Sequence, residues 1–310
     1  MTRWVGNSFS SFLGRSLVAG CAALAAPSAS AIIVSSGPGD GATSDWLGVG
    51  KIGDTLGNNF YGTGVLIDPQ HVLTAAHLVD GHTAAQMKFE VNGVTYSASS
   101  IAINPNYDPA GDAFDIAVIT LSIVATNTPT YRYDDGTLIS TTPGQTGYKV
   151  GYGYGGNGAT GMTPGLYPYG TKRAGVNAID MITTGTTHVV DGFGTGYDIP
   201  ANMLVYDFDN HQAGTSGPLG GPALGPSEAD TTIGDSGGPM FQWSEALNDW
   251  VVTGITIGGT DDAVRFGDIG FDTRVAAYSS WIGAQVPEPA SASLLVGAAA
   301  LLMRRRRFSH

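Results

Sequence analysis

The sequence predicts an all-β fold, a barrel or a sandwich, from three observations. Glycine accounts for 46 of the 310 residues, about twice its usual share and without a collagen-like period, so we expect many turns. Short runs rich in β-branched residues are separated by clusters of Gly, Asn, Asp and Pro, and helical periodicity is scarce. With 42% apolar residues, a chain of this length can bury one large core or two small ones.

The charge balance is acidic, with 26 acidic and 14 basic residues and a formal net charge of −12. Such a surface argues against a nucleic acid or an anionic membrane as a stable partner. Cys21 is the single cysteine, so we expect the residues that follow it to fold without disulfides.

Residues 1–31 have the features of a secretory signal peptide: two arginines, an apolar stretch and a small-residue cleavage site (Arg3, Arg15, Leu17–Ala26, Ala29–Ala31). Cys21 also ends a short sequence that resembles a lipoprotein box. Arg15 interrupts the apolar run that lipidation would need, so the sequence favours the ordinary signal peptide over that alternative.

The first strands are expected at Gly62–Ile67 and His71–Thr74, as a hairpin turning at Asp68-Pro69. His77 follows directly, where a strand gives way to a loop, which is a common place for a general base. The other internal histidines have no comparable setting and are expected to be solvated or structural (His71, His82, His188, His211).

Phe114–Leu121 alternates in polarity and predicts a strand that Asp115 leads. A carboxylate at a buried strand start is costly unless it is hydrogen-bonded, and a histidine ring N–H is one suitable partner. Asp112 is the competing acid, but it lies in a Gly-Asp turn and is expected to be exposed.

Residues 122–145 read as a link between two halves of the chain, and Tyr148–Tyr154 as a strand. We expect Gly153–Gly170 to be an exposed glycine- and tyrosine-rich loop. Asp207–Asn210 carries oxygen ligands that suit calcium, although an ordinary acidic turn explains the same pattern. Trp250–Ile257 predicts another strand.

Gly234–Pro239 places Ser236 between an acid and two glycines. A serine hydroxyl is a poor nucleophile until a base takes its proton and fixed donors hold the oxyanion that forms. Glycines allow the sharp backbone turn that aims N–H groups at one point.

Four stretches together resemble the trypsin/chymotrypsin-like serine proteases, and the resemblance covers about residues 32–285: Leu73–His77, Phe114–Val118, Gly234–Pro239, and Gly270–Val275 with Tyr278, Trp281 and Ile282. The resemblance implies two six-stranded Greek-key β-barrels, about residues 32–125 and 126–285, with a short C-terminal helix. It also implies a monomer that needs no cofactor or metal.

The resemblance implies hydrolysis of peptide bonds in a protein or peptide substrate. His77 would act as base, Asp115 would orient it, and Ser236 would be the nucleophile, with the N–H groups of Gly234 and Ser236 as oxyanion hole. An ester would satisfy the same residues. The alternative is a catalytically inactive module that binds polysaccharide or protein at a cell surface or in an extracellular matrix.

Asp230 lies six residues before Ser236, where trypsin-type relatives carry the acid that binds lysine or arginine. The pocket wall would then be formed by three glycines (Gly258, Gly259, Gly270). Two features depart from the family: Thr232 replaces a cysteine, and Arg265 is a candidate to neutralise Asp230. A simple exposed acid is the alternative.

Cleavage after Ala31 would leave Ile32 at a new N-terminus. In the family a freed N-terminal ammonium inserts beside the acid that precedes the catalytic serine, here Asp235. Signal removal would then activate the enzyme without a separate propeptide. An unremarkable frayed terminus is the alternative.

Residues 286–310 resemble the PEP-CTERM sorting signal of Gram-negative bacteria: Val286–Pro289, then the apolar run Ala290–Met303, then Arg304–Arg307. The run is shorter than the ~20 residues of a stable span. The resemblance implies transient membrane contact, removal near Pro287 by an exosortase-like sorting protease, and a secreted or cell-surface product. A permanent anchor is the alternative.

Overall fold

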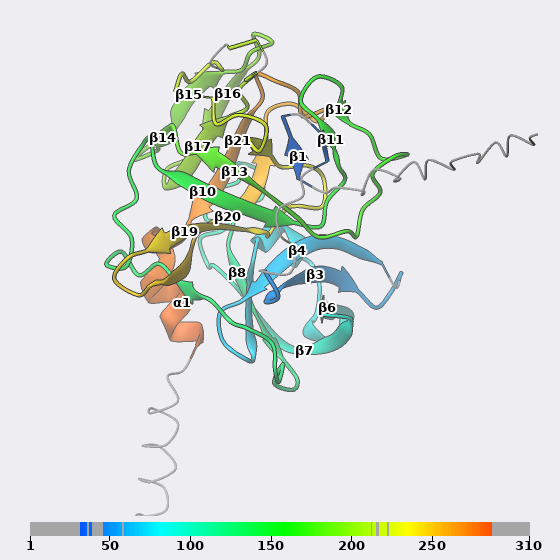
Figure 1. Cartoon of the computed structure of the whole chain (residues 1–310). Coiled ribbons are helices and arrows are strands. Elements are labelled where there is room, and N and C mark those ends of the chain that lie inside the picture. The colour runs from blue at the N-terminus through cyan, green and yellow to red at the C-terminus, as the bar shows by residue number, and fades with distance from the viewer. Residues whose placement is uncertain are drawn as a thin grey trace, which may run out of the picture.

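The computed structural model describes residues 32–35, 37–38, 46–57, 59–211, 213–214, 217–221 and 223–286. The predicted signal peptide, residues 1–31, and nearly all of the predicted sorting tail lie outside the described residues. The described chain is mostly strands in two halves, with one short α-helix near its end (Figure 1). The all-β prediction is confirmed.

The N-terminal half is a closed six-stranded barrel in which neighbouring strands run antiparallel in the order β3-β4-β5-β8-β7-β6. Its strands are β3 (Val49–Asp54), β4 (Phe60–Leu66), β5 (His71–Thr74), β6 (Met87–Val91), β7 (Val94–Ile103) and β8 (Ala117–Leu121). The predicted hairpin is β4–β5. Its turn is held by Asp68, whose carboxylate accepts hydrogen bonds from the N–H groups of Gln70 and His71.

The C-terminal half is a sheet in the order β13-β10-β19-β20-β21-β17-β14, curled into a half-barrel, with β9 paired parallel to β20. Its strands are β9 (Arg132–Tyr133), β10 (Thr146–Gly151), β13 (Arg173–Ala178), β14 (Met181–Ile182), β17 (Met203–Asp207), β19 (Pro239–Ser244), β20 (Asp249–Gly259) and β21 (Ile269–Arg274). This half corresponds to the second expected barrel, but the sheet does not close on itself.

A small sheet changes the predicted boundary between the halves. Its strands are β1 (Ile33–Val34), β2 (Gly37–Pro38), β11 (Gly156–Asn157), β12 (Gly161–Met162) and β18 (Ala229–Asp230). β1 runs antiparallel to β18 and parallel to β11, so it lies among the green and yellow strands of the C-terminal half (Figure 1). The N-terminal barrel therefore begins at β3 rather than near residue 32, because Ile32 and Val34 pack on Ala229.

The remaining elements are short. The hairpin of β15 (Thr187–Val190) and β16 (Gly196–Ile199) forms a sheet of its own. The helical segments are η1 (Ala76–Leu78), η2 (Ala84–Gln86), η3 (Val275–Tyr278) and α1 (Ser279–Gln285), of which the first three are 3₁₀ turns. Within the described part of the chain, no helix is long and apolar enough to cross a membrane.

Apolar contacts join the halves. Trp46, just before β3, stacks on Phe241 of β19 with ring centroids 4.5 Å apart and an interplanar angle of 14°. Such aromatic pairs add to the free-energy gain from burying apolar surface.

The loop expected at Gly153–Gly170 is exposed only in its second part, because residues 153–158 are largely buried against the segment that leads to Ser236.

Candidate active site

His77 lies in η1, at the end of strand β5, and it is bound to Asp115 in two ways. The ring Nδ1 is 2.6 Å from Asp115 Oδ2, and the backbone N–H of His77 donates to Asp115 Oδ1 at 2.9 Å. The Asp115 side chain is 1% exposed and the His77 side chain 31%. One ring nitrogen is therefore held by a buried carboxylate, while the ring itself still reaches the surface.

Asp115 is fixed from both halves of the fold. The preceding residue, Phe114, has φ +57°, so the chain makes a sharp turn before β8 begins. The hydroxyl of Thr273, from β21, donates to the Asp115 carbonyl at 2.8 Å. The competing acid, Asp112, is exposed as expected. The geometry thus pairs His77 with Asp115.

The turn that carries Ser236 is packed against the strands that lead to His77. The N–H of Thr63, in β4, donates to the Ser236 carbonyl at 2.8 Å. Gly237 has φ +80°, and a Cβ on it would lie 2.2 Å from both the Thr63 carbonyl oxygen and Thr74 Oγ1. Only glycine fits this close approach.

No hydrogen bond joins the Ser236 hydroxyl to His77 among the described residues. Catalytic hydrogen bonds of this kind are often long before substrate binds. The shared packing on β4 and β5 is what brings the two segments to the same end of the barrel.

The backbone N–H groups around Ser236 fall into two sets. Those of Asp235, Gly237 and Gly238 donate to the carbonyls of Thr232, Thr256 and Asp235, at 2.8–2.9 Å. Within the described residues, the N–H groups of Gly234 and Ser236 have no acceptor. Two unpaired donors in one turn are what an oxyanion hole requires.

Asp235 is fully buried and its carboxylate is held by backbone donors. Oδ1 accepts from the N–H of Gly153 at 2.7 Å, and Oδ2 from that of Thr232 at 2.8 Å. Burial raises the pKa of Asp235 to about 6, although these hydrogen bonds and the positive charge of Arg173 oppose the rise. The carboxylate therefore shapes the turn on both sides of Ser236.

Ile32, the predicted partner of Asp235, is buried and has φ +23°. The described hydrogen bonds include none between these two residues. The next residue, Ile33, pairs in register with Asp230 across β1 and β18. Ile32 and Ile33 thus lie beside the segment that precedes Ser236, and the activation pair stays a prediction.

Asp230, the predicted base of a substrate pocket, is fully buried. Gly259 is exposed, Gly258 is half-buried, and Gly270 is the buried cross-strand partner of Gly259. Arg265 does not neutralise Asp230, because its Nε donates to Asp261 Oδ2 at 2.9 Å.

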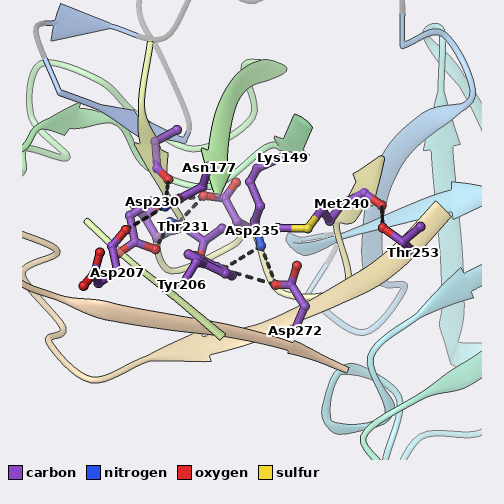
Figure 2. Close-up of polar contacts among 12 residues, drawn as sticks. Lys149, Asn177, Tyr206, Asp207, Asp230, Thr231, Asp235, Met240, Thr253 and Asp272 are labelled. Carbon is purple, nitrogen blue, oxygen red and sulfur yellow. Dashed lines mark hydrogen bonds and ion pairs between the residues drawn. The ribbon is translucent and has the colours of Figure 1, made fainter. Parts of the chain in front are cut away.

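Sequence reasoning missed a group of buried charges beneath this wall (Figure 2). The Lys149 ammonium donates to the Tyr206 hydroxyl at 2.6 Å and to the Asp272 carboxylate, and all three side chains are fully buried. A further buried acid, Asp268, precedes β21. In the sequence, Asp268 and Asp272 stand beside apolar residues, which indicates buried acids. Nothing in the sequence, however, pairs these acids with a lysine of β10.

The acidic segment Asp207–Asn210, for which calcium and an ordinary acidic turn were the alternatives, is held by the backbone of neighbouring loops. The carboxylates of Asp207, Asp209 and Glu228 accept hydrogen bonds from backbone N–H groups of the surrounding loops. Across the described ranges, no three His, Cys, Asp or Glu side chains come together in a way that could hold a metal ion.

The other internal histidines each have a hydrogen-bond partner. Three of the partners lie within ten positions in the sequence: His71 with Asp68, His82 with the Asp80 carbonyl and His188 with Asp198. The fourth, Ser35 with His211, joins distant parts of the chain.

Compared with known families, residues 62–255 match the trypsin-like peptidase domain. This match covers more than half of the chain, so the protein belongs to that family. It carries a serine protease fold, and a domain of this class implies peptide substrates.

Proposed function

We propose that this protein is a secreted serine endopeptidase that uses His77, Asp115 and Ser236. The observation that carries the proposal is the pairing of His77 with a buried carboxylate next to a turn whose two N–H groups, at Gly234 and Ser236, are unpaired within the described chain. Base, orienting acid, nucleophile and oxyanion donors are then supplied by one end of the barrel.

In the proposed reaction, Ser236 Oγ attacks the scissile carbonyl carbon while His77 Nε2 takes its proton. The two N–H groups hold the oxyanion. His77 then gives the proton to the leaving amine, the C–N bond breaks, and an acyl-enzyme remains. Water, activated by His77, releases the acid. Asp115 keeps Nδ1 protonated and stabilises the imidazolium.

The proposal includes cleavage after lysine or arginine, with Asp230 at the pocket base and Gly258, Gly259 and Gly270 along its wall. The engagement of Arg265 by Asp261 supports this, because it leaves Asp230 without that competing cation. Kinetics on peptides that differ only in arginine or phenylalanine before the scissile bond test it. A preference for phenylalanine would refute the assignment.

The proposal also includes activation by removal of residues 1–31, which frees the Ile32 amino group to pair with Asp235. A second positive charge would favour ionisation of a carboxyl whose pKa burial raises to about 6. Adding Met before Ile32 should lower activity sharply, whereas full activity in that variant would end the idea.

For the chain ends, we propose export by the signal peptide and sorting through residues 286–310 by an exosortase-like protease of a Gram-negative bacterium. Both segments lie outside the described residues, apart from Val286. Intact mass of the mature protein tests both: termini at Ile32 and near Pro287 are expected, and a retained tail would indicate an anchor.

A fluorophosphonate probe tests the chemistry directly. We expect covalent labelling of the wild type, none of Ser236→Ala, and labelling of His77→Ala slowed by a factor of at least about 10³. A folded wild-type protein that does not react would instead favour the inactive binding module.

A further inference from the structure

Two buried carboxyls lie together under the glycine wall of the candidate pocket. Gly259 and Gly270 are cross-strand partners in β20 and β21. A Cβ on Gly270 would lie 2.7 Å from Asp230 Oδ1, and a Cβ on Gly259 would lie 3.0 Å from Asp268 Oδ2. Asp230 and Asp268 are each 0% exposed. The two acids therefore occupy one small volume, one side chain's depth below exposed Gly259.

Each carboxyl uses one oxygen for the backbone and leaves the other without a donor. Asp230 Oδ1 accepts from the Thr231 N–H at 2.7 Å. Asp268 Oδ1 accepts from three N–H groups and one hydroxyl, at 2.7–3.0 Å (Thr260, Asp261, Ile269). Among the described residues, neither Asp230 Oδ2 nor Asp268 Oδ2 has a hydrogen-bond partner.

The basic residues nearby are bound elsewhere. Lys149, from β10, binds Asp272 and Tyr206, so its charge is already matched (Figure 2). Arg265 binds Asp261 on the β20–β21 loop. In the described chain, no ion pair reaches Asp230 or Asp268.

The other titratable groups around the pair also bring no positive charge. Tyr206 of β17 donates its hydroxyl to Asp272 of β21, and Tyr197 of β16 donates its hydroxyl to the Thr260 carbonyl. Burial, and then the charge of Asp268, raise the pKa of Asp230 well above its usual value, while the Thr231 N–H and the charge of Lys149 oppose the rise. Burial also raises the pKa of Asp268, while its hydrogen bonds oppose the rise.

Two carboxylates buried in one small volume repel each other, so one proton between the two unpaired oxygens satisfies both. The pair then carries a single negative charge and has no ion-pair partner among the described residues. No side chain projects from the wall at Gly258 and Gly259, and the nearest atom to a Cβ on Gly258 would be Phe271 Cζ at 4.0 Å.

We propose that Asp230 and Asp268 act together as the receptor for one cationic substrate side chain, and that its binding expels the proton they share. This rests on the proposed function and adds Asp268 as a specificity residue. The lysine or arginine side chain enters over Gly258 and Gly259. The proton leaves Asp230 for solvent, and both carboxylates then face the cation. A guanidinium, with its fork of donors, suits two acceptors.

Calorimetry with benzamidinium, a planar cation, tests the proposal without needing turnover. We expect release of about one proton per molecule bound, measured from titrations in buffers of different ionisation enthalpy. The Kd should therefore fall about tenfold per pH unit while the pair titrates. Benzamide, the neutral isostere, should bind at least tenfold more weakly and release none.

Asp268→Asn should abolish proton release and flatten the pH dependence of the Kd. Asp262→Asn, an exposed acid on the same loop, is the matched control and should leave both unchanged. Equal binding of benzamide and benzamidinium, or cation binding without proton release, overturns the proposal even if Asp268→Asn does not fold. Failure of the proposed function is seen separately, as absence of fluorophosphonate labelling at Ser236.

Discussion

Arg173 and Asp235 bind the same residue from opposite sides. Arg173 Nη1 donates to the Gly153 carbonyl at 3.0 Å, while the Gly153 N–H donates to Asp235 Oδ1 at 2.7 Å. Both side chains are buried. Arg173 Nε and Nη2 have no hydrogen-bond partner among the described residues. The guanidinium therefore acts on Asp235 as a nearby positive charge that favours its ionised form.

Replacing this guanidinium should weaken the fold in a pH-dependent way. We expect Arg173→Met to lower the free energy of unfolding by on the order of 3 kcal/mol at pH 8, where Asp235 is left ionised and uncompensated. The loss should be smaller at pH 5, because a carboxyl with a pKa of about 6 is then mostly protonated. Urea unfolding at both pH values measures this.

The controls for this prediction are an exposed cation and the acid itself. Arg132→Met removes an exposed positive charge from β9, and should show no such pH dependence. Adding Asp235→Asn to Arg173→Met should recover part of the loss at pH 8. Equal losses at both pH values would contradict the proposed charge interaction.

The turn at Gly237 allows a test of close packing with a matched control. Gly81 has φ +73° with nothing within 4 Å of a built Cβ, so Gly81→Ala should cost about 1–2 kcal/mol from backbone strain alone. Gly237→Ala has similar strain but also overlaps the backbone of β4, so we expect at least about 2 kcal/mol more. Thermal or urea unfolding separates the two, and similar losses would argue against this packing.

The buried pair of Lys149 and Asp272 should depend on both partners. Lys149→Met leaves a buried carboxylate unpaired and should cost about 3–5 kcal/mol of unfolding free energy. Adding Asp272→Asn should restore most of it. For comparison, Lys51→Met breaks a more exposed pair with Glu90 and should cost under about 1 kcal/mol. A loss in Lys149→Met that the second change deepens would contradict this account.

The acidic loops should make the fold more stable in mild acid than at neutral pH. Burial, with mutual repulsion, raises the pKa of Asp207 and Glu228 to about 7, and burial raises that of Asp180 to about 6. Since these folded values exceed the unfolded ones, the stabilisation is complete below about pH 4 and is lost as pH rises to about 7. Each group can contribute up to about 1.4 kcal/mol per pH unit.

Urea unfolding at pH 5 and pH 8 checks the sign. Asp207→Asn should reduce the difference in unfolding free energy between the two pH values, because an amide does not titrate. The amide oxygen can still accept the hydrogen bond from the Leu219 N–H, so the loop should keep its structure. Glu245→Gln, on an exposed turn, should leave the difference unchanged. Greater stability at pH 8 than at pH 5, unaltered by Asp207→Asn, would refute the prediction.

The stretches around His77, Asp115 and Ser236 could be recognised from sequence because each carries its chemistry in a few consecutive residues. The strands β5 and β20 were predictable for the same local reason. Lys149 and Asp268 were not, because their roles come from residues on other segments. Asp272 lies 123 positions after Lys149, and Asp230 lies 38 positions before Asp268.

The placement of β1 shows a second limit. A two-residue strand has too little pattern to reveal its partner, and its pairing with β18 is set by the packing of Ile32 and Val34 on Ala229. Likewise, Arg265 was a plausible counter-ion for Asp230 by composition, but Asp261 is four residues away on its own loop and binds it.

Thr232 has a consequence for how this protein can be handled. Its hydroxyl donates to the Tyr154 carbonyl at 2.5 Å and to Asp235 Oδ2 at 3.1 Å. These hydrogen bonds, which hold the turn that carries Ser236, are therefore insensitive to reducing agents. Cys21, the single cysteine, lies outside the described residues. The folded part should regain its structure from denaturant without any oxidant, and should tolerate production in a reducing cytoplasm.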